Sequence, residues 1–168
     1  SVRAAETKDA RTGLKLTLPG ATFCGEFSRR KRDNLTKHSG LLCLDFDDVE
    51  DLVAKKEALS KDDHVVMAFV SPSGTGLKVI LRVPDGVDHD HVFDECARYL
   101  KHYELEADRA ASDVSRLCFL SHDPDAIINF DAEELPIMPP EIEQKMRSSV
   151  PETGDRIGDR YNACANVR

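Results

Sequence analysis

Two aspartates lie close together where an apolar run of the chain ends. Asp45 and Asp47 follow residues 41–44, and the alternation of side chains along a strand puts both carboxylates on one face. Two such carboxylates repel each other unless a cation lies between them, and a divalent metal, which prefers oxygen ligands, is the usual solution. The competing interpretation is that these acids only end a strand and cap a helix that begins near Val49.

A glycine-rich loop supplies a second group of candidates. Residues 71–78 join two apolar segments, and Gly74 and Gly76 would leave backbone amides open to a phosphate. Ser73 and Lys78 could add a hydroxyl and a cation. The loop lies between two strands and not between a strand and a helix, so it is neither a P-loop nor a Rossmann turn. A tight hairpin also needs glycine, so the loop alone leaves both interpretations open.

A third group combines acids with an arginine. Asp108 precedes a segment that carries Arg116, so a third carboxylate and a guanidinium could reach the same face of a sheet. Several carboxylates suit metal-assisted phosphoryl transfer, and the guanidinium fork suits phosphate oxygens. Asp113 could take the place of Asp108, and either acid could instead cap a helix. His122 follows, in a segment typical of a turn.

A basic cluster precedes the acidic strand. The net charge of −8 argues against a nucleic-acid partner, but charge distribution matters more than the sum. A solvated loop and a nucleic-acid contact both remain open for its four residues, Arg29, Arg30, Lys31 and Arg32.

Strands and helices must position these groups. Apolar patterns predict strands at residues 41–44, 65–70, 79–83 and 114–121 and helices at residues 49–59 and 91–105. Residues 14–18 are predicted as a short strand or an extended arm. The second and third of the long apolar strands flank the glycine loop, which makes that unit a hairpin. A further short helix is predicted at residues 141–146.

Length and composition set the class of protein. With 168 residues and 40% hydrophobic content, the chain is long enough for one domain, predicted at residues 1–135, followed by a linker at residues 136–168. No apolar run approaches the roughly 20 residues that span a bilayer, so we expect a soluble, cytoplasmic protein. Five cysteines without a Cys-x-x-Cys pair suit reduced thiols and argue against structural zinc.

Taken in order, the three groups resemble the motifs of the archaeo-eukaryotic primase superfamily, especially the primase-polymerases of phages and other mobile elements. That family's first motif is a strand ending in Asp-x-Asp, as at Asp45 and Asp47. Its third is an aspartate followed eight or nine residues later by Arg-Leu, as at Asp108 and Arg116. The second, Ser-Gly-x-Gly-x-His, has Lys78 at the histidine position and is otherwise matched by Ser73, Gly74 and Gly76. The resemblance covers about residues 14–129.

The resemblance implies a fold and an activity. The fold is a two-layer α+β domain with a mainly antiparallel sheet, like that of an RNA-recognition motif, flanked by helices. The activity is template-directed nucleotidyl transfer with two Mg²⁺ or Mn²⁺ ions. The metals would bind to Asp45, Asp47 and Asp108. The nucleotide would be held by Ser73, Gly74, Gly76, Lys78, Arg116 and His122.

The resemblance also implies partners. They are a single-stranded DNA template, an NTP or dNTP, and a helicase or primase-associated module after the linker. The template would follow the basic cluster at Arg29, Arg30, Lys31 and Arg32.

Two other functions fit parts of the sequence. A domain of primase ancestry could bind nucleotide or nucleic acid without catalysis, since Lys78 replaces histidine and the net charge is acidic. Residues 44–48 also resemble the opening of haloacid-dehalogenase-type phosphatases, in which the first aspartate, here Asp45, is a nucleophile and a later strand ends in Ser or Thr, as at Ser71.

Overall fold

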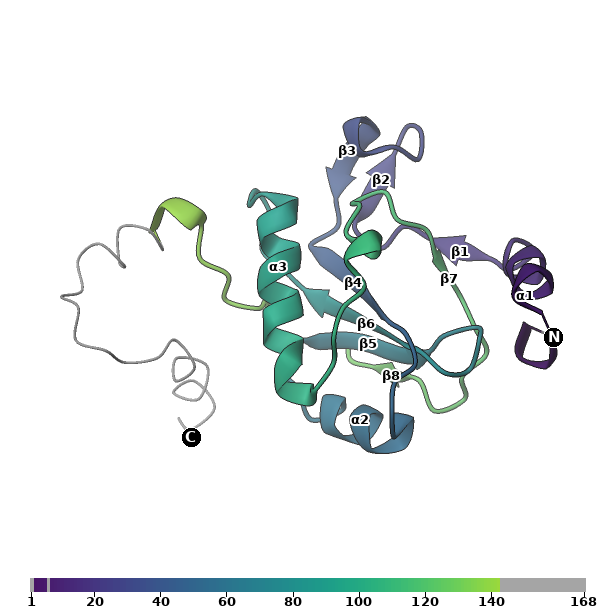
Figure 1. Ribbon diagram of the computed structural model, residues 1–168. Helices are drawn as coiled ribbons and strands as arrows, with labels where there is room; N and C mark the ends of the chain where they lie inside the picture. Colours follow the sequence, from purple (N-terminus) through teal and green to yellow (C-terminus); the bar gives the residue numbers. More distant parts are fainter. Residues whose placement is uncertain (1, 6, 143–168) are drawn as a thin grey trace. The chain divides into compact units, whose positions relative to one another are not determined.

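An antiparallel sheet forms the centre of the fold (Figure 1). The computed structural model describes residues 2–5 and 7–142. Within them this sheet has the strand order β4-β6-β5-β8, with β4 at Leu41–Phe46, β5 at Val65–Val70, β6 at Leu77–Arg82 and β8 at Ile127–Ile128. β5 and β6 form the predicted hairpin around the glycine loop. β6 also pairs with β4, in a register that sets Asp45 opposite Lys78.

Helices cover one face of this sheet. Alternate residues of β4, namely Leu42, Leu44 and Phe46, are buried on that face. They pack in one core with α3 (His89–Leu100), which carries apolar side chains at helical spacing. The side chain of Asp88 caps α3, and α2 (Leu52–Leu59) packs beside β5. The buried residues of α3 are Val92, Phe93, Cys96 and Leu100.

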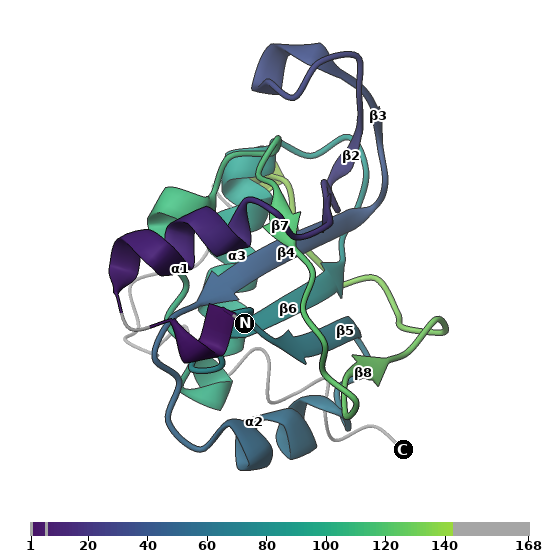
Figure 2. The same ribbon diagram turned by 90° about the vertical axis from the view of Figure 1, so that its right-hand side faces the viewer.

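The N-terminal segment covers part of the opposite face. α1 (Lys8–Lys15) leads into β1 (Gly20–Ala21), which pairs with β7 (Cys118–Phe119). Figures 1 and 2 together show α1 and α3 on opposite sides of the sheet. A separate hairpin is formed by β2 (Gly25–Phe27) and β3 (Leu35–His38). The apolar cluster that joins β7 to this face contains Val66, Phe69, Ile80, Cys118 and Ala132.

Short 3₁₀ turns connect the remaining elements of the described residues. They are η1 (Val2–Ala4), η2 (Arg32–Asn34), η3 (Lys101–Tyr103) and η4 (Arg109–Ala111). The chain up to Ile137 forms one compact unit, and a second unit begins at Met138. The predicted linker and the predicted helix at residues 141–146 lie largely outside the described residues.

The predicted fold class is confirmed: the chain folds as a two-layer α+β domain with an antiparallel sheet. The strands predicted at residues 41–44, 65–70 and 79–83 correspond to β4, β5 and β6, and the long helices to α2 and α3. The likeness to an RNA-recognition motif holds for the order of the three long strands, β4-β6-β5. In that motif the last strand lies beside the first, whereas β8 here pairs with β5.

One predicted strand is wrong, and another is shorter than predicted. Residues 14–15 instead end helix α1, which begins because the hydroxyl of Thr7 accepts a hydrogen bond from Ala10 N (3.2 Å). Residues 114–121 contain only the two strand residues of β7. Asp113 holds the preceding segment in a turn, since its carboxylate accepts a hydrogen bond from Ser115 N and its carbonyl oxygen accepts one from Arg116 N.

The structure also bears on the phosphatase alternative, on membrane-spanning helices and on the state of the cysteines. The antiparallel sheet excludes the phosphatase alternative, because that fold needs a parallel sheet with helical crossovers. Across residues 2–5 and 7–142, no helix has the length and apolar character needed to cross a membrane. The cysteines of this part are free thiols: Cys24, Cys43, Cys96 and Cys118.

Gly76 lets the loop between β5 and β6 pack closely against the end of β4. A Cβ atom at this position would lie 2.5 Å from the carbonyl oxygen of Phe46 and 3.0 Å from Ser71 Oγ. The hydrogen bond from Val49 N to the carbonyl oxygen of Thr75 (2.8 Å) fixes the same approach. Glycine is therefore needed here for backbone packing.

We expect Gly76→Ala to lower the free energy of unfolding by about 1–3 kcal/mol, because the backbone must shift to admit the methyl group. Gly13→Ala is the matched control, since a Cβ at Gly13 in α1 meets nothing within 4 Å. It should raise stability by about 0.5–1 kcal/mol through helix propensity. Urea denaturation measures both changes, and equal effects of the two substitutions would contradict the packing role of Gly76.

Candidate functional site

A buried lysine and an aspartate face each other across β4 and β6. The register sets Asp45 opposite Lys78, so both side chains project from the same face of the sheet. The Nζ atom of Lys78 lies 2.7 Å from Oδ2 of Asp45, and the two side chains are only 9% and 21% exposed. A buried lysine needs a counter-charge, and Asp45 supplies it. Lys78 is therefore a cation next to Asp45, in the role that the sequence predicts for a metal.

This ion pair lies in a cavity of about 400 Å³ that opens to solvent. Four segments that are distant in sequence form its wall: the end of α1, the β2–η2 loop, the β4–β6 strand pair with the adjoining loop, and the chain entering β7. The polar side chains of the wall are Lys15, Arg30, Asp45, Asp47, Ser71, Lys78 and Arg116. The apolar ones are Leu16, Pro72, Leu117 and Phe119.

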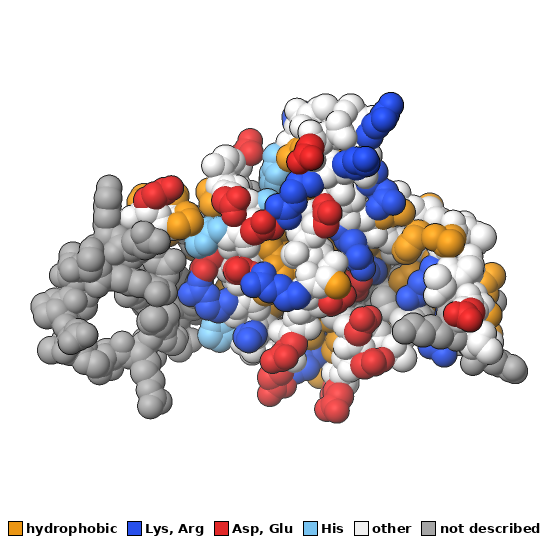
Figure 3. Space-filling view, turned by 45° about the horizontal axis from the view of Figure 1, so that its top comes forward, with side chains coloured by type: hydrophobic (Ala, Val, Ile, Leu, Met, Phe, Trp, Pro, Cys, Tyr) orange, Lys and Arg blue, Asp and Glu red, His pale blue; other side chains and the backbone are white. Residues whose placement is uncertain are grey.

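The cavity has a positive balance of charge. Its lining carries four cationic side chains and two carboxylates, although the whole chain has a net charge of −8. Figure 3 shows Lys and Arg side chains gathered toward the top of the face in view, with many Asp and Glu side chains along its lower edge. Positive potential concentrated in a concave site favours an anionic ligand.

A larger hollow of about 570 Å³ lies on the other side of Asp47. Its wall is acidic, with one lysine against five carboxylates, which would repel an anion. The charged residues that line it are Asp47, Asp48, Glu50, Lys55, Glu104 and Glu106. The smaller cavity is therefore the candidate anion site.

The glycine loop contributes a different serine from the one predicted. The amide of Gly74 donates to the carbonyl oxygen of Ser71 (2.9 Å), and the amide of Gly76 donates to Ser71 Oγ (3.2 Å). Both amides are thus used within the turn. Ser73 lies outside the cavity wall, and its hydroxyl is 2.8 Å from that of Ser71, which does line the cavity.

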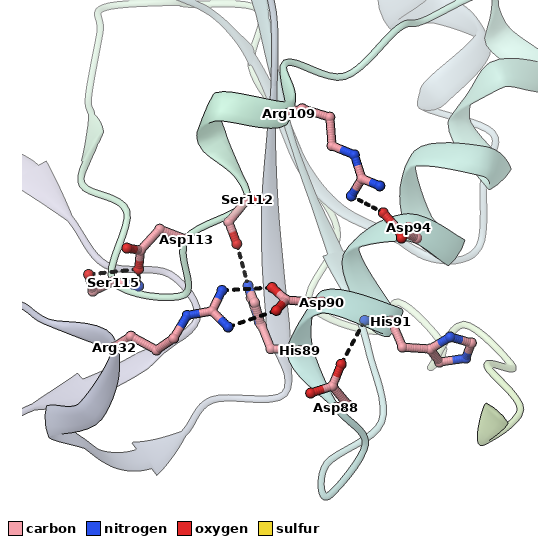
Figure 4. Close-up of polar contacts among 10 residues, drawn as sticks. All are labelled: Arg32, Asp88, His89, Asp90, His91, Asp94, Arg109, Ser112, Asp113 and Ser115. Carbon is pink, nitrogen blue, oxygen red and sulfur yellow. Dashed lines mark hydrogen bonds and ion pairs between the residues drawn. The ribbon is translucent and has the colours of Figure 1, made fainter. Parts of the chain in front are cut away.

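The third acidic residue approaches the site through its backbone. Asp108 N donates to the carbonyl oxygen of Asp45 (3.0 Å), but the Asp108 carboxylate accepts from Ala110 N (2.9 Å) and caps η4. The carboxylate of Asp113 accepts from Ser115 N and Oγ (2.7 and 2.8 Å), as Figure 4 shows, and these bonds lower its pKa. Neither acid lines the cavity.

The available donors fit a metal only in part. No group of three or more His, Cys, Asp or Glu side chains in the described part of the chain could hold an ion. The cavity offers two carboxylates, Asp45 and Asp47. Mg²⁺ commonly binds through one or two carboxylates plus the phosphates of a substrate. The cavity therefore suits a metal that binds together with a polyphosphate, and it lacks the three acids expected for two ions.

The basic cluster is divided between two roles. Arg30 lines the cavity, whereas Arg32 forms a two-pronged ion pair with Asp90 at the start of α3 (2.6 and 2.8 Å; Figure 4). The hydrogen bonds from Arg32 lower the pKa of Asp90. Arg32 thus attaches the loop to α3, while Arg29 and Lys31 are exposed beside it.

His122 lies outside the cavity. Its side chain is exposed, and its carbonyl oxygen accepts a hydrogen bond from Arg3 (3.1 Å). The next residue, Asp123, has a structural role, because its carboxylate accepts from Lys56 Nζ (2.7 Å) and Val70 N (2.8 Å). This contact fixes the end of β5 beside the cavity-lining Ser71.

Residues 13–127 match a family described as "BT4734-like, N-terminal domain", and this match covers more than half of the chain. The chain belongs to this family. All the residues that line the cavity fall inside the matched segment of this BT4734-like domain. No curated protein and no solved structure matches the chain.

Some cavity residues of the BT4734-like domain were missed from the sequence. Lys15 and Leu16 were overlooked because their segment was assigned to a strand and no motif surrounds them. Ser71 did carry a signal, since it is the first residue after a buried strand and begins the glycine loop. The sequence analysis assigns Ser71 a role only in the phosphatase alternative, as the serine at the end of a later strand.

We expect Lys78→Met to lower the free energy of unfolding by about 3 kcal/mol, because it leaves the Asp45 carboxylate without its cation. The double variant Lys78→Met/Asp45→Asn should regain a large part of this loss. Lys61→Met, in an exposed ion pair with Glu57, should change stability by less than about 0.5 kcal/mol. Chemical denaturation gives all three values. A double variant no more stable than Lys78→Met would refute the pairing.

Proposed function

We propose that this BT4734-like domain is a nucleotidyltransferase of the DNA primase-polymerase type, acting on single-stranded DNA in the replication of a phage or mobile element. It would bind an NTP or dNTP together with Mg²⁺ or Mn²⁺. One observation carries the proposal: Asp45, Asp47, Lys78 and Arg116, chosen from three separate sequence motifs, line a single cavity.

The cations of the cavity suit a triphosphate. Arg30 and Arg116 reach it from different segments, and each guanidinium can donate two parallel hydrogen bonds to phosphate oxygens. Lys78 adds a point charge at the sheet surface, where Asp45 already holds its ammonium. These groups would fix a chain of phosphates across the cavity and place its reacting phosphorus near the two carboxylates.

Asp45 and Asp47 are the residues that would hold the metal. The chemistry that a bound divalent ion would supply there is a lower charge on the triphosphate and an activated attacking hydroxyl. The carboxylate of Asp45 has its Lys78 partner on one side, so Lys78 orients it before any ligand arrives. Asp108 supports the same strand end through its backbone bond to Asp45. We assign it a positioning role instead of the metal-binding role predicted from the sequence.

The β2–η2 loop is the proposed path of the template. Arg30 belongs both to the cavity wall and to the basic cluster, so positive charge continues from the cavity onto this loop. Arg29 and Lys31 are exposed there, and Arg32 anchors the loop to α3 through Asp90. A strand of phosphates lying on the loop would bring its end close to the bound nucleotide.

A second candidate function is nucleotide binding without catalysis. The observations that favour it are the Lys78–Asp45 ion pair, which neutralises one carboxylate, and the absence of the Asp108 carboxylate from the cavity wall. Such a domain would use the same cations for phosphate and would need no metal ligands.

We expect the full chain to incorporate nucleotides on single-stranded DNA, with or without a primer, in the presence of Mn²⁺ or Mg²⁺. Asp45→Asn/Asp47→Asn should reduce incorporation at least about 100-fold, because it removes both carboxylate ligands. Asp63→Asn/Asp131→Asn is the matched control: it makes the same change of charge at two exposed aspartates outside the cavity and should leave incorporation unchanged.

Other outcomes separate the two candidates. A wild-type chain that binds nucleotide but incorporates none with either metal would contradict the enzyme and support the binding domain. A chain that binds no nucleotide would contradict both functions. If both double variants lose incorporation equally, the assignment of Asp45 and Asp47 to the site is contradicted.

A further inference from the structure

We infer that the apolar wall of the cavity binds the base of the nucleotide by stacking, with little preference among the four bases. This inference rests on the proposed function and extends it to the part of the ligand beyond the phosphates. The wall is made by three of the four apolar residues that line the cavity, Leu16, Leu117 and Phe119, and the four cations line the same cavity. A nucleotide combines a polyanion with a flat ring whose faces can stack on apolar side chains.

The exposure of Leu16 suggests that a ligand covers this wall. Its side chain is 71% exposed at the C-terminal end of α1, next to Lys15. An isolated exposed leucine is common on protein surfaces, but this one borders a cavity that four cationic side chains also line. Contact with a base would remove its apolar surface from water, which is favourable.

The wall is also held in place by specific packing. β1 pairs with β7 so that Gly20 lies opposite Phe119, and Leu120 N donates to the carbonyl oxygen of Pro19 (2.9 Å). Gly20 leaves room for Leu117, because a Cβ there would lie 2.9 Å from Leu117 Cδ1. The strand pair therefore fixes Leu117 and Phe119 to the same short segment that follows Leu16.

The chemistry of the wall predicts weak discrimination between bases. Its three side chains offer no hydrogen-bond donor or acceptor, whereas the cations and Ser71 lie among the polar residues of the lining. Every base has an apolar face that can stack on an aromatic ring, so stacking tolerates all four. Reading of a base edge would need polar side chains, and none belongs to this wall.

The test compares ATP with inorganic tripolyphosphate, both with Mg²⁺, by isothermal titration of the full chain. We expect wild type to bind ATP more tightly than tripolyphosphate. Phe119→Ala should weaken ATP about tenfold and leave tripolyphosphate unchanged, since it removes only the stacking surface. Phe130→Ala is the matched control, because Phe130 is 79% exposed and outside the cavity.

Leu16→Ala is a second test, needed in case Phe119→Ala does not fold. Its exposed side chain contributes little to the core, so weaker ATP binding with unchanged tripolyphosphate binding would support the inference independently. We also expect CTP, GTP and UTP to bind within a few-fold of ATP.

Three results would overturn the inference. Equal affinity of wild type for ATP and tripolyphosphate would remove the base site and leave the phosphate cavity of the proposed function intact. A difference of more than about tenfold among the four nucleotides would contradict stacking without base readout. If neither ATP nor tripolyphosphate binds, both the base site and the proposed function are contradicted.

Discussion

The buried contact between Lys78 and Asp45 is the interaction on which the site depends. A lysine between two fully buried neighbours, Leu77 and Val79, loses hydration that only a nearby carboxylate can replace. This requirement favours the register of β4 and β6 in which the two residues are opposite. The same register places Asp47 just beyond the strand, where it completes the pair of carboxylates. One cross-strand contact thus links the register of the sheet to the position of the site.

Backbone contacts hold the surroundings of this ion pair close to it. Gly76 permits the loop after β5 to touch the end of β4, and Asp108 N binds the carbonyl oxygen of Asp45. The sequence predicts ligand binding for both residues. The close approach explains the glycine at position 76, and the carboxylate of Asp108 has a separate role as the cap of η4. The other three cations of the cavity come from outside this framework: Lys15, Arg30 and Arg116 each lie on a connecting segment or at the end of a helix.

The sequence was most informative where long apolar runs determine the structure. The three long strands and the hairpin around the glycine loop could be predicted from their apolar runs, and Asp45 and Asp47, predicted to lie close together, both line the cavity. The role of Asp108 could not, because a cap and a metal ligand both use an exposed aspartate. Helix α1 was missed because a cap at Thr7 outweighed a short alternation, and Lys15 and Leu16 were missed with it. Contacts among four distant segments depend on tertiary packing, which no local motif contains.

We propose that Asp45 and Asp47 bind a divalent ion only together with a polyphosphate. Electron paramagnetic resonance of Mn²⁺ tests it directly, since free and bound Mn²⁺ give different signal intensities. We expect little binding of Mn²⁺ by the chain alone, because the described part of the chain has no three-residue ligand group. Binding should become strong when a non-hydrolysable nucleoside triphosphate is added, beyond what the nucleotide binds by itself, and this gain should vanish in Asp45→Asn/Asp47→Asn. Mn²⁺ binding that is equal with and without nucleotide, or unaffected by the double substitution, would contradict the account.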